Sequence, residues 1–430
     1  MDIDRTLLAR FRSAAPPYAL YPCPAWFVEA FDTATLEAVL RARAVTGGPH
    51  LAISVAMPET VAARRGDERC DWPDWLLREA GMYREAIGAA RVAAYHVDIA
   101  GALDRTRLRR VLTGLSSLFD ARSQAAPLLS ARLRPLHATP RACAALGVAG
   151  VTHLELDPYL PRYEREPSTA VPQGDAAQLA EAIGTARAQG IASVGAHLVL
   201  HVDDESGSDA AARLSQVLAA QPDHLSLHTA PSGLPNHLHA ERLAQAARLL
   251  AEAAYEPIAQ DVYARADAPL ALTRQQGRLS RRPFGLLALP QGDTLGLGPG
   301  AFGGTGIAGW RNHRTPARYC TALAEGHLPV GRGVLSTPED ALRRAAMHSL
   351  GTHFMLDLEG LETAHGVDMA SVCAAELADL ENLAEAGVLY RDGRIYELTQ
   401  SGRLMAGVAT EVFDACRRRA LARAPRVARL

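Results

Sequence analysis

Strands and helices alternate along most of this chain at the spacing of βα units, and this alternation limits the possible folds more than any other feature. Short apolar runs such as Leu51-Ala-Ile-Ser-Val55 have the character of buried parallel strands. Each run is followed by a longer segment with helical spacing. The pattern predicts an α/β fold with a parallel sheet covered by helices. Periodicity alone does not separate a (β/α) barrel from a doubly wound sheet.

The expected elements follow directly from this alternation. The strands are Leu51–Val55, Val92–Asp98, Leu128–Leu133, Val151–Asp157, Ala192–Val202, Leu225–His228 and Pro257–Tyr263. The helices are Thr33–Ala44, Arg105–Phe119, Asp175–Gln189, Asp209–Ala220 and Leu238–Ala253.

The pattern changes after Gly333. Thr337-Pro-Glu-Asp340 has the residues of a capped helix start, and Asp392-Gly393 between two β-rich runs predicts a hairpin. We therefore expect an N-terminal arm (1–48), a (β/α) domain (49–333) and a helical, winged-helix-like domain (334–430). The helices expected in this last domain are Ala341–Phe354, Leu358–Ala364, Met369–Ala386 and Ser401–Leu421.

Residues 292–312 are too rich in glycine to be ordinary packing. Gly296, Gly298 and Gly300 lie close to a G-x-G-x-x-G pattern. That dinucleotide motif opens a βαβ unit and needs backbone N–H groups and a later acidic residue. Here the glycines come late, Pro299 removes an N–H, and no such acid follows. We interpret the stretch as a closely packed passage from strand to loop.

Seven stretches of the chain carry motifs of one known family. They are Tyr18-Ala-Leu-Tyr-Pro22, Tyr255–Arg265, Phe284, Asp293–Ala301, Trp310-Arg-Asn312, Tyr319 and Leu398-Thr-Gln-Ser-Gly-Arg-Leu404. Together they resemble the oxygen-independent coproporphyrinogen III oxidase family, whose members are radical S-adenosylmethionine (SAM) enzymes of porphyrin synthesis. The resemblance covers almost the whole chain and is strongest after Gln221. It implies a partial (β/α) barrel of radical SAM type, covered by the C-terminal helical domain.

The cluster motif of that family is missing. Its members carry C-x-x-x-C-x-x-C directly after the first strand, to hold a [4Fe–4S] cluster. Placing Val55-Ala-Met-Pro58 on the family's V-H-I-P puts these positions at Thr60, Arg64 and Asp67, and Cys70 is the only cysteine nearby. We therefore expect neither a [4Fe–4S] cluster nor SAM.

The SAM contacts implied by the resemblance are also replaced. The glycine-rich turn after the second strand corresponds to His96-Val-Asp-Ile-Ala-Gly101, which is too bulky for close backbone approach. Polar positions of the family fall near Arg132 and Tyr159 and at His197. These losses favour a chain that no longer cleaves SAM.

Histidines and acids recur at every second residue of the expected strands, so each set shares one face. If these faces turn inward, they could hold a transition metal or a haem iron. The plainer interpretation is hydrogen-bonded polar filling. The sets are His96 and Asp98; His153, Glu155 and Asp157; His197, Val199 and His201; and His224, Ser226 and His228, and the metal candidates among them are His153, Glu155, Asp157, His197, His201 and His228.

Charge and cysteine usage narrow the function classes. The net charge of −2 argues against a general nucleic-acid surface. The six cysteines are scattered without a C-x-x-C pair, which is typical of neither a disulfide framework nor a zinc site. No apolar run approaches the roughly 18 to 20 residues of a membrane span. The start of the chain lacks the pattern of a signal peptide, so we expect a cytoplasmic protein.

Together these features predict a catalytically degenerate relative of the oxidases that binds a porphyrin or haem. It would act as a carrier, a scaffold or a regulatory partner of a porphyrin enzyme. Arg265, Arg311 and Arg314 are candidates to bind the carboxylates of the tetrapyrrole. The alternatives are a metal-dependent enzyme that uses the inward histidines and acids, or a ligand-free subunit of an active paralogue.

Overall fold

One large curved sheet organises the described part of the chain. The computed structural model describes residues 3–12, 17–46, 50–58, 64–65, 68–69, 71–88, 90–119, 126–160, 176–200, 207–229 and 235–423. Within them the sheet has 12 strands in the order β16-β15-β14-β13-β1-β4-β5-β6-β7-β8-β10-β9. These strands are β1 (Leu51–Met57), β4 (Val92–Ile99), β5 (Leu128–Leu133), β6 (His153–Leu156), β7 (Ser193–Leu200), β8 (His224–Thr229), β9 (Tyr255–Ala259), β10 (Val262–Arg265), β13 (Thr294–Leu297), β14 (Phe302–Gly304), β15 (Ala308–Asn312) and β16 (Val330–Leu335).

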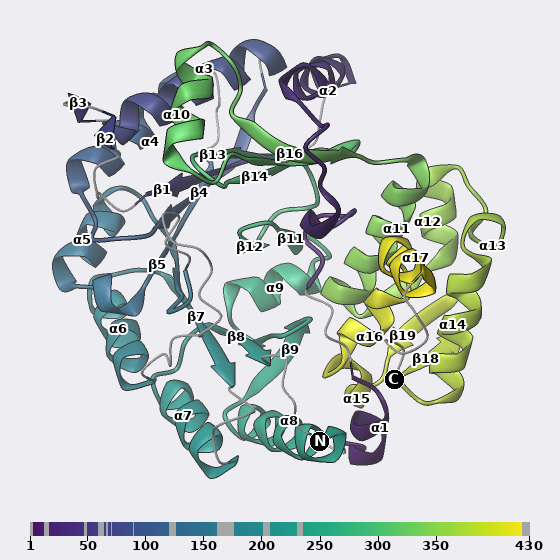
Figure 1. Ribbon diagram of the computed structural model, residues 1–430. Coiled ribbons are helices and arrows are strands. Elements are labelled where there is room, and N and C mark those ends of the chain that lie inside the picture. Colours follow the sequence, from purple (N-terminus) through teal and green to yellow (C-terminus); the bar gives the residue numbers. More distant parts are fainter. Residues whose placement is uncertain are drawn as a thin grey trace.

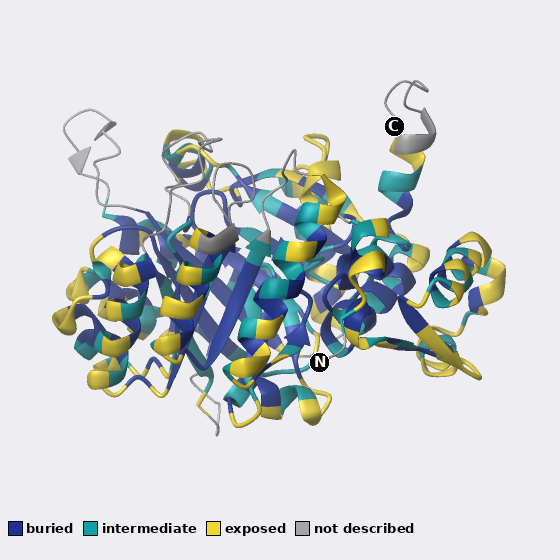
Figure 2. Cartoon of the chain, turned by 90° about the horizontal axis from the view of Figure 1, so that it is seen from below, coloured by how far each residue is buried: buried dark blue, intermediate teal, exposed yellow. Residues whose placement is uncertain are grey.

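The centre of the sheet, from β13 through β1 to β8, is parallel, as the alternation predicts. Helices surround it on the outside, and their inner faces are buried against the strands (Figures 1 and 2). Every residue of β1 is buried, which explains its continuous apolar run. The surrounding helices are α2 (Thr33–Thr46), α3 (Trp72–Ile87), α4 (Arg105–Phe119), α5 (Pro140–Val148), α6 (Ala176–Ala188), α7 (Gly207–Ala219) and α8 (Asn236–Glu252).

A short hairpin lies inside the ring of strands. It consists of β11 (Ser280–Arg282) and β12 (Gly285–Leu287) and lies beside α9 (Pro269–Gln275) (Figure 1). The ring of Phe284 at its tip stacks on His96 of β4, with centroids 4.5 Å apart and an interplanar angle of 12°. The hairpin therefore reaches the inward face of the central strands.

The curved sheet does not close into a complete barrel, because its two edge strands, β16 and β9, do not pair with each other. The C-terminal region lies on this open side (Figure 1). Gln260 N donates to Gly351 O at 2.7 Å and so joins the β9–β10 turn to it. Its elements are α11 (Pro338–His348), α12 (Leu358–His365), α13 (Met369–Val372), α14 (Ala374–Glu385), α15 (Gln400–Arg403), α16 (Ala406–Glu411), α17 (Ala415–Arg423), and the small sheet of β17 (Met355–Asp357), β19 (Ile395–Leu398) and β18 (Leu389–Asp392).

The N-terminal arm ties these parts together. Helix α1 (Arg5–Arg10) lies beside α8, and Val28 and Gly333 exchange backbone hydrogen bonds of 2.9 and 3.0 Å. Tyr21 Oη accepts from Ala415 N at 2.9 Å. Strand β16 spans the domain boundary that we expect after Gly333.

Some sequence predictions need correction. The single strand expected over Pro257–Tyr263 is the hairpin β9–β10, because Asp261 turns the chain with a φ of 61°. The long final helix is three short ones, and Asp414 caps the last by accepting from Arg417 N at 2.9 Å. Helix α11 ends at His348, where a wide turn leads to Phe354 in the left-handed region. The helix expected over 369–386 is interrupted at Cys373.

In the described residues, no helix is both long enough and apolar enough to cross a bilayer.

Candidate functional site

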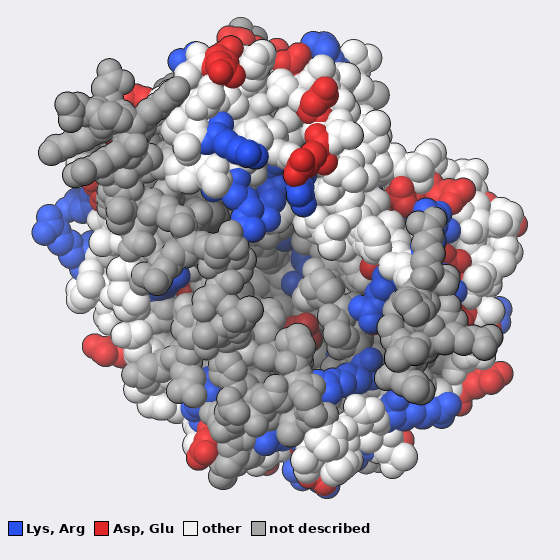
Figure 3. All heavy atoms as spheres, viewed as in Figure 1, with Lys and Arg blue, Asp and Glu red and all other residues white. Residues whose placement is uncertain are grey.

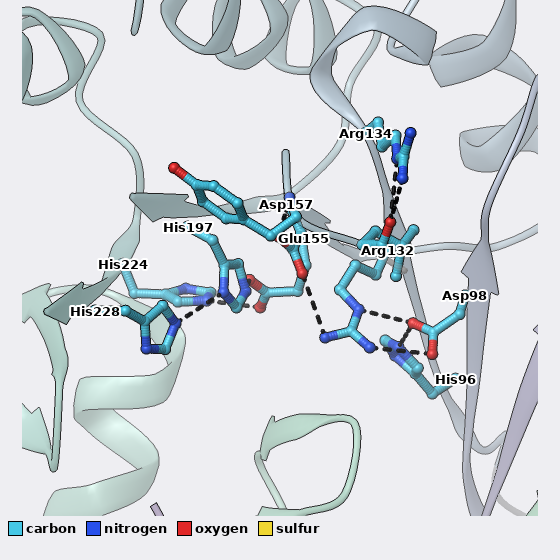
Figure 4. Close-up of polar contacts among 11 residues, drawn as sticks. His96, Asp98, Arg132, Arg134, Glu155, Asp157, His197, His224 and His228 are labelled. Carbon is cyan, nitrogen blue, oxygen red and sulfur yellow. Dashed lines mark hydrogen bonds and ion pairs between the residues drawn. The ribbon is translucent and has the colours of Figure 1, made fainter. Parts of the chain in front are cut away.

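The inward faces of β6, β7 and β8 carry a cluster of imidazoles around one carboxylate, as strand alternation predicts. We call His153, Glu155, His197, His224 and His228 the histidine face. Glu155 Oε1 lies 2.6 Å from His224 Nε2, and its Oε2 lies 3.3 Å from His197 Nε2. His197 Nδ1 lies 3.4 Å from His228 Nε2, which extends the chain of contacts by one ring (Figure 4).

Glu155 and His224 form a buried ion pair. Burial alone would raise the pKa of Glu155, but His224 and His197 hold it well below its ordinary value. Burial alone would lower the pKa of His224, and Glu155 outweighs this and raises it. Both shifts favour a carboxylate facing an imidazolium.

A glycine on β7 makes room for this pair. A Cβ at Gly195 would lie 2.2 Å from His224 Nε2 and 2.4 Å from Glu155 Oε2. Any side chain at this position would therefore displace the ion pair.

His228 differs from His224 because it is neutral. Burial, followed by the charge of His197, lowers its pKa to about 4. A neutral imidazole can bind a metal or a haem iron through a ring nitrogen, and a protonated one cannot. A cavity of about 70 Å³ lies against the histidine face and is also bordered by Arg281 and Phe284.

A second network lies on β4, β5 and β6, towards the carboxyl ends of these strands. Arg132 bonds both oxygens of Asp98 at 2.8 and 3.1 Å, and its Nη1 lies 3.6 Å from Asp157 Oδ2. His96 Nε2 lies 2.9 Å from the same Asp98 (Figure 4). Burial would raise the pKa of Asp98, and Arg132 and His96 hold it well below its usual range. These side chains therefore bond to one another.

In the described part of the chain, no three side chains of His, Cys, Asp or Glu are arranged around a point that could hold a metal ion. Asp157 contacts Arg132 rather than the histidines. His201 lies outside the described residues.

The three arginines expected to bind a tetrapyrrole do not lie together. Ala264 pairs with His224, the first residue of β8, and the two strands are antiparallel. The next residue, Arg265, therefore lies at the amino end of β8, and its Nη2 is 3.8 Å from Asp223 Oδ1. Arg311 pairs with Phe302, which lies against Gly296 near the carboxyl end of β13, and its guanidinium covers the Phe302 ring at 4.6 Å. Arg314 is exposed two residues after β15. Because β10 runs against the parallel strands, Arg265 is at the opposite end of the sheet.

The residues after β1 do not fit a [4Fe–4S] cluster. Thr60 and Asp67 lie outside the described residues, and so does the side chain of Arg64 in β2 (Arg64–Arg65). The segment from Pro58 to Asp71 contains one cysteine in the sequence, whereas such a cluster needs three thiolates from this loop.

Residues 292–312, which we call the glycine wall, are packed as the sequence predicts. A Cβ at Gly298 would lie 2.4 Å from Ala56 O, and its φ is +103°. Glu79 of α3 binds the wall, because it accepts from Gly298 N at 2.8 Å and from Asn312 Nδ2 at 2.6 Å. Tyr319 Oη adds a third bond to Glu79, at 2.5 Å. Sequence reasoning missed Glu79, since α3 was not among the expected helices.

Two further buried groups were also missed. Arg281 of the hairpin borders the cavity beside the histidine face. His348 Nε2, on α11, is buried without a hydrogen-bond partner among the described residues. The sequence signal that could have identified Arg281 is the pair of adjacent arginines close to an aromatic residue, Arg281-Arg-Pro-Phe284.

The comparisons with known proteins agree with the motifs. Residues 336–405 match the family model described as the HemN C-terminal domain. The oxygen-independent coproporphyrinogen III oxidase of Pseudomonas aeruginosa is 30% identical over 237 residues, so the match spans 52% of each chain. The enzyme of the same name from Salmonella typhimurium is 24% identical over 442 residues, or 96% of each chain.

The fold is also that of a solved relative. The structure of coproporphyrinogen III oxidase (HemN) from Escherichia coli, described as a radical SAM enzyme, has a TM-score of 0.77 to this chain. It is 21% identical, and the match covers 96% of this chain and 99% of that one. The family resemblance and the expected fold class, with a C-terminal helical domain, are thus confirmed.

Proposed function

We propose that this chain, a relative of the oxygen-independent coproporphyrinogen III oxidases, binds a tetrapyrrole in porphyrin metabolism and does not cleave SAM. In this role it serves as a carrier, a scaffold or a regulatory partner of a porphyrin enzyme. The observation that carries the proposal is the number of cysteines after β1. This segment contains one cysteine, whereas a [4Fe–4S] cluster would need three cysteine thiolates there.

The Asp98–Arg132–Asp157 network supports the same conclusion. It lies at the carboxyl ends of β4 to β6, the end of a parallel sheet where ligands of such folds bind. Because Arg132 is satisfied by two carboxylates, displacing it would leave buried charges without partners. A cofactor that needed this surface would have to break the network.

The hollow at this end of the strands is the place we propose for the tetrapyrrole. The face shown in Figure 3 is hollowed near its centre, and arginine side chains border the hollow. Charged nitrogen groups at such a rim suit the carboxylates of a porphyrin. The neutral His228 supplies a nitrogen that could bind a haem iron from the interior.

A titration of the purified protein with haem and with coproporphyrin, followed through the Soret band, tests the proposal. We expect a saturable shift at one equivalent. For haem, we expect the shift to change in His228→Ala and His197→Ala and to persist in His365→Ala, because His365 is exposed on α12. The absence of any saturable shift with either ligand would contradict tetrapyrrole binding.

A separate experiment tests the loss of SAM chemistry. After anaerobic reconstitution with iron and sulfide, we expect no [4Fe–4S] spectrum and no SAM cleavage. A cluster that cleaves SAM would overturn the proposal. If one equivalent of metal is bound in protein purified without a His tag, the metal-dependent enzyme is favoured instead. Co-purification with a cluster-bearing homologue, without porphyrin or metal binding, would favour the ligand-free subunit.

A further inference from the structure

A pocket of about 370 Å³ lies where the N-terminal arm, the base of the sheet and the C-terminal helices meet. Its lining includes Thr294, which pairs with Ala52 at the amino end of β1, so the pocket is at the end opposite the hollow. Tyr21 belongs to the arm, and Arg344 comes from α11. We call this space the junction pocket.

Four arginines line the junction pocket, and one of them is neutralised there. Arg43 Nε lies 2.5 Å from Asp293 Oδ2 in a buried ion pair. The other three, Arg281, Arg282 and Arg344, form no ion pair with a carboxylate of the described residues. The lining therefore carries more positive than negative charge.

These three guanidiniums bond backbone carbonyls instead. Arg281 donates to Gln260 O, Arg282 to Pro290 O and Arg344 to Gly306 O, each at 2.7 Å. A carbonyl satisfies a donor but does not cancel a charge. Burial lowers the pKa of Arg281 and of Arg282 to about 10, although Asp261 and Asp293 partly offset it.

His348 of α11 is not among the residues that line the junction pocket. It follows Arg344 by one helical turn on α11, and its Nε2 is buried without a hydrogen-bond partner among the described residues. Burial, His353, Arg281 and Arg282 lower its pKa to about 3, so the ring is neutral. His348 therefore adds no counter-charge to the nearby guanidiniums.

We propose that the junction pocket binds a small organic dianion, either a phosphate monoester or a dicarboxylate, through Arg281 and Arg344. The planar guanidinium fork matches the paired oxygens of both groups. The volume is within the range of pockets for small ligands and exceeds the need of an inorganic ion. Bound there, the dianion fastens the arm and α11 to the base of the sheet.

Isothermal titration of the full chain with phenyl phosphate, succinate and inorganic phosphate tests the site, with glycerol as a neutral control. We expect saturable binding of at least one organic dianion and none of glycerol. Arg344→Gln should weaken that binding about tenfold or more, since it removes a charged donor. The preferred probe then separates a phosphate ester from a dicarboxylate.

Arg318→Gln is the matched control, because Arg318 is exposed on α10 (Pro316–Ala324) outside the pocket. It should bind as the unchanged chain does. Arg281→Gln gives a second test, and we expect severalfold weaker binding with unchanged circular dichroism. Failure of all three anions to bind, or equal binding by Arg344→Gln, would overturn the site. Since the pocket and the hollow lie at opposite ends, Arg344→Gln should leave the Soret titration unchanged.

Discussion

The glycine wall and the histidine face form two parts of one sheet, and they are built on opposite principles. In the wall, backbone approaches backbone, and the key contact is Gly298 against Ala56 O. In the histidine face, charged side chains approach each other across strands, with Glu155 between His197 and His224. At Gly298 the wall leaves no space for a ligand, although its residues near the amino end of β13 line the junction pocket. The histidine face borders a smaller cavity.

Two of the family motifs, Asp293–Ala301 and Trp310-Arg-Asn312, fall in the wall, and this position limits what they can say about function. Gly298, Asn312 and Tyr319 all contact Glu79, so their identities follow from packing and hydrogen bonding alone. A chain can keep them for its fold whatever its chemistry. The strands around the interior are where the sequence departs from the family pattern, and these strands carry the ionisable groups.

Gly298→Val should have the largest effect on folding. The new Cβ would meet Ala56 O at 2.4 Å, in a backbone conformation that valine avoids. We expect a loss of about 4 kcal/mol in the free energy of unfolding, or no soluble protein. Gly81→Ala, in α3 with nothing near its added methyl, should be neutral or stabilising by about 0.5–1 kcal/mol. A folded Gly298→Val protein of normal stability in urea would show that the wall is not tightly packed.

Glu155→Gln should destabilise the histidine face by about 3 kcal/mol, because it leaves His224 buried without its counter-charge. Glu241→Gln, exposed on α8, is the control and should change little. Urea unfolding measures both. An unchanged free energy for Glu155→Gln would mean that the pair is not formed.

The pH dependence of that difference follows from the signs of the two pKa shifts. The lowered pKa of Glu155 gives stability that is present above its ordinary value of 4.5 and lost as pH falls through the folded pKa. The raised pKa of His224 gives stability that is present below 6.5 and lost as pH rises through the folded pKa. The gap between wild type and Glu155→Gln should therefore be widest from about pH 4.5 to 6.5.

Glu79 should give the wall a pH dependence of its own. Burial raises its pKa to about 8, against the hydrogen bonds from Tyr319 and Gly298. The folded state then holds a proton that the unfolded state releases, so stability falls between pH 4.5 and 8 by up to about 1.4 kcal/mol per unit. Glu79→Gln should remove this slope. Identical slopes for both proteins in urea titrations would show that Glu79 is ionised throughout.

Sequence patterns predicted most strands correctly but only part of the site. Period-two alternation correctly placed Glu155, His197 and His224 on one face, because neighbouring parallel strands pair in a regular register. Alternation cannot give the direction of a strand relative to the sheet, so Arg265 was grouped with Arg311 at the wrong end. Nor can it show contacts between distant segments, such as Glu79 with Asn312 or Arg344 with Tyr21.

Arg311→Gln should have the smallest effect on stability of these variants. Arg311 covers the Phe302 ring and donates to Gly300 O at 3.1 Å, so its contacts belong to the wall. We expect a loss of about 0.5–1 kcal/mol in urea unfolding. The Soret titration with coproporphyrin should stay unchanged if the ligand lies over the interior strands. A weaker Soret response in Arg311→Gln than in Arg318→Gln would instead move the ligand to the rim beside the wall. The family motifs there would then serve binding as well as packing.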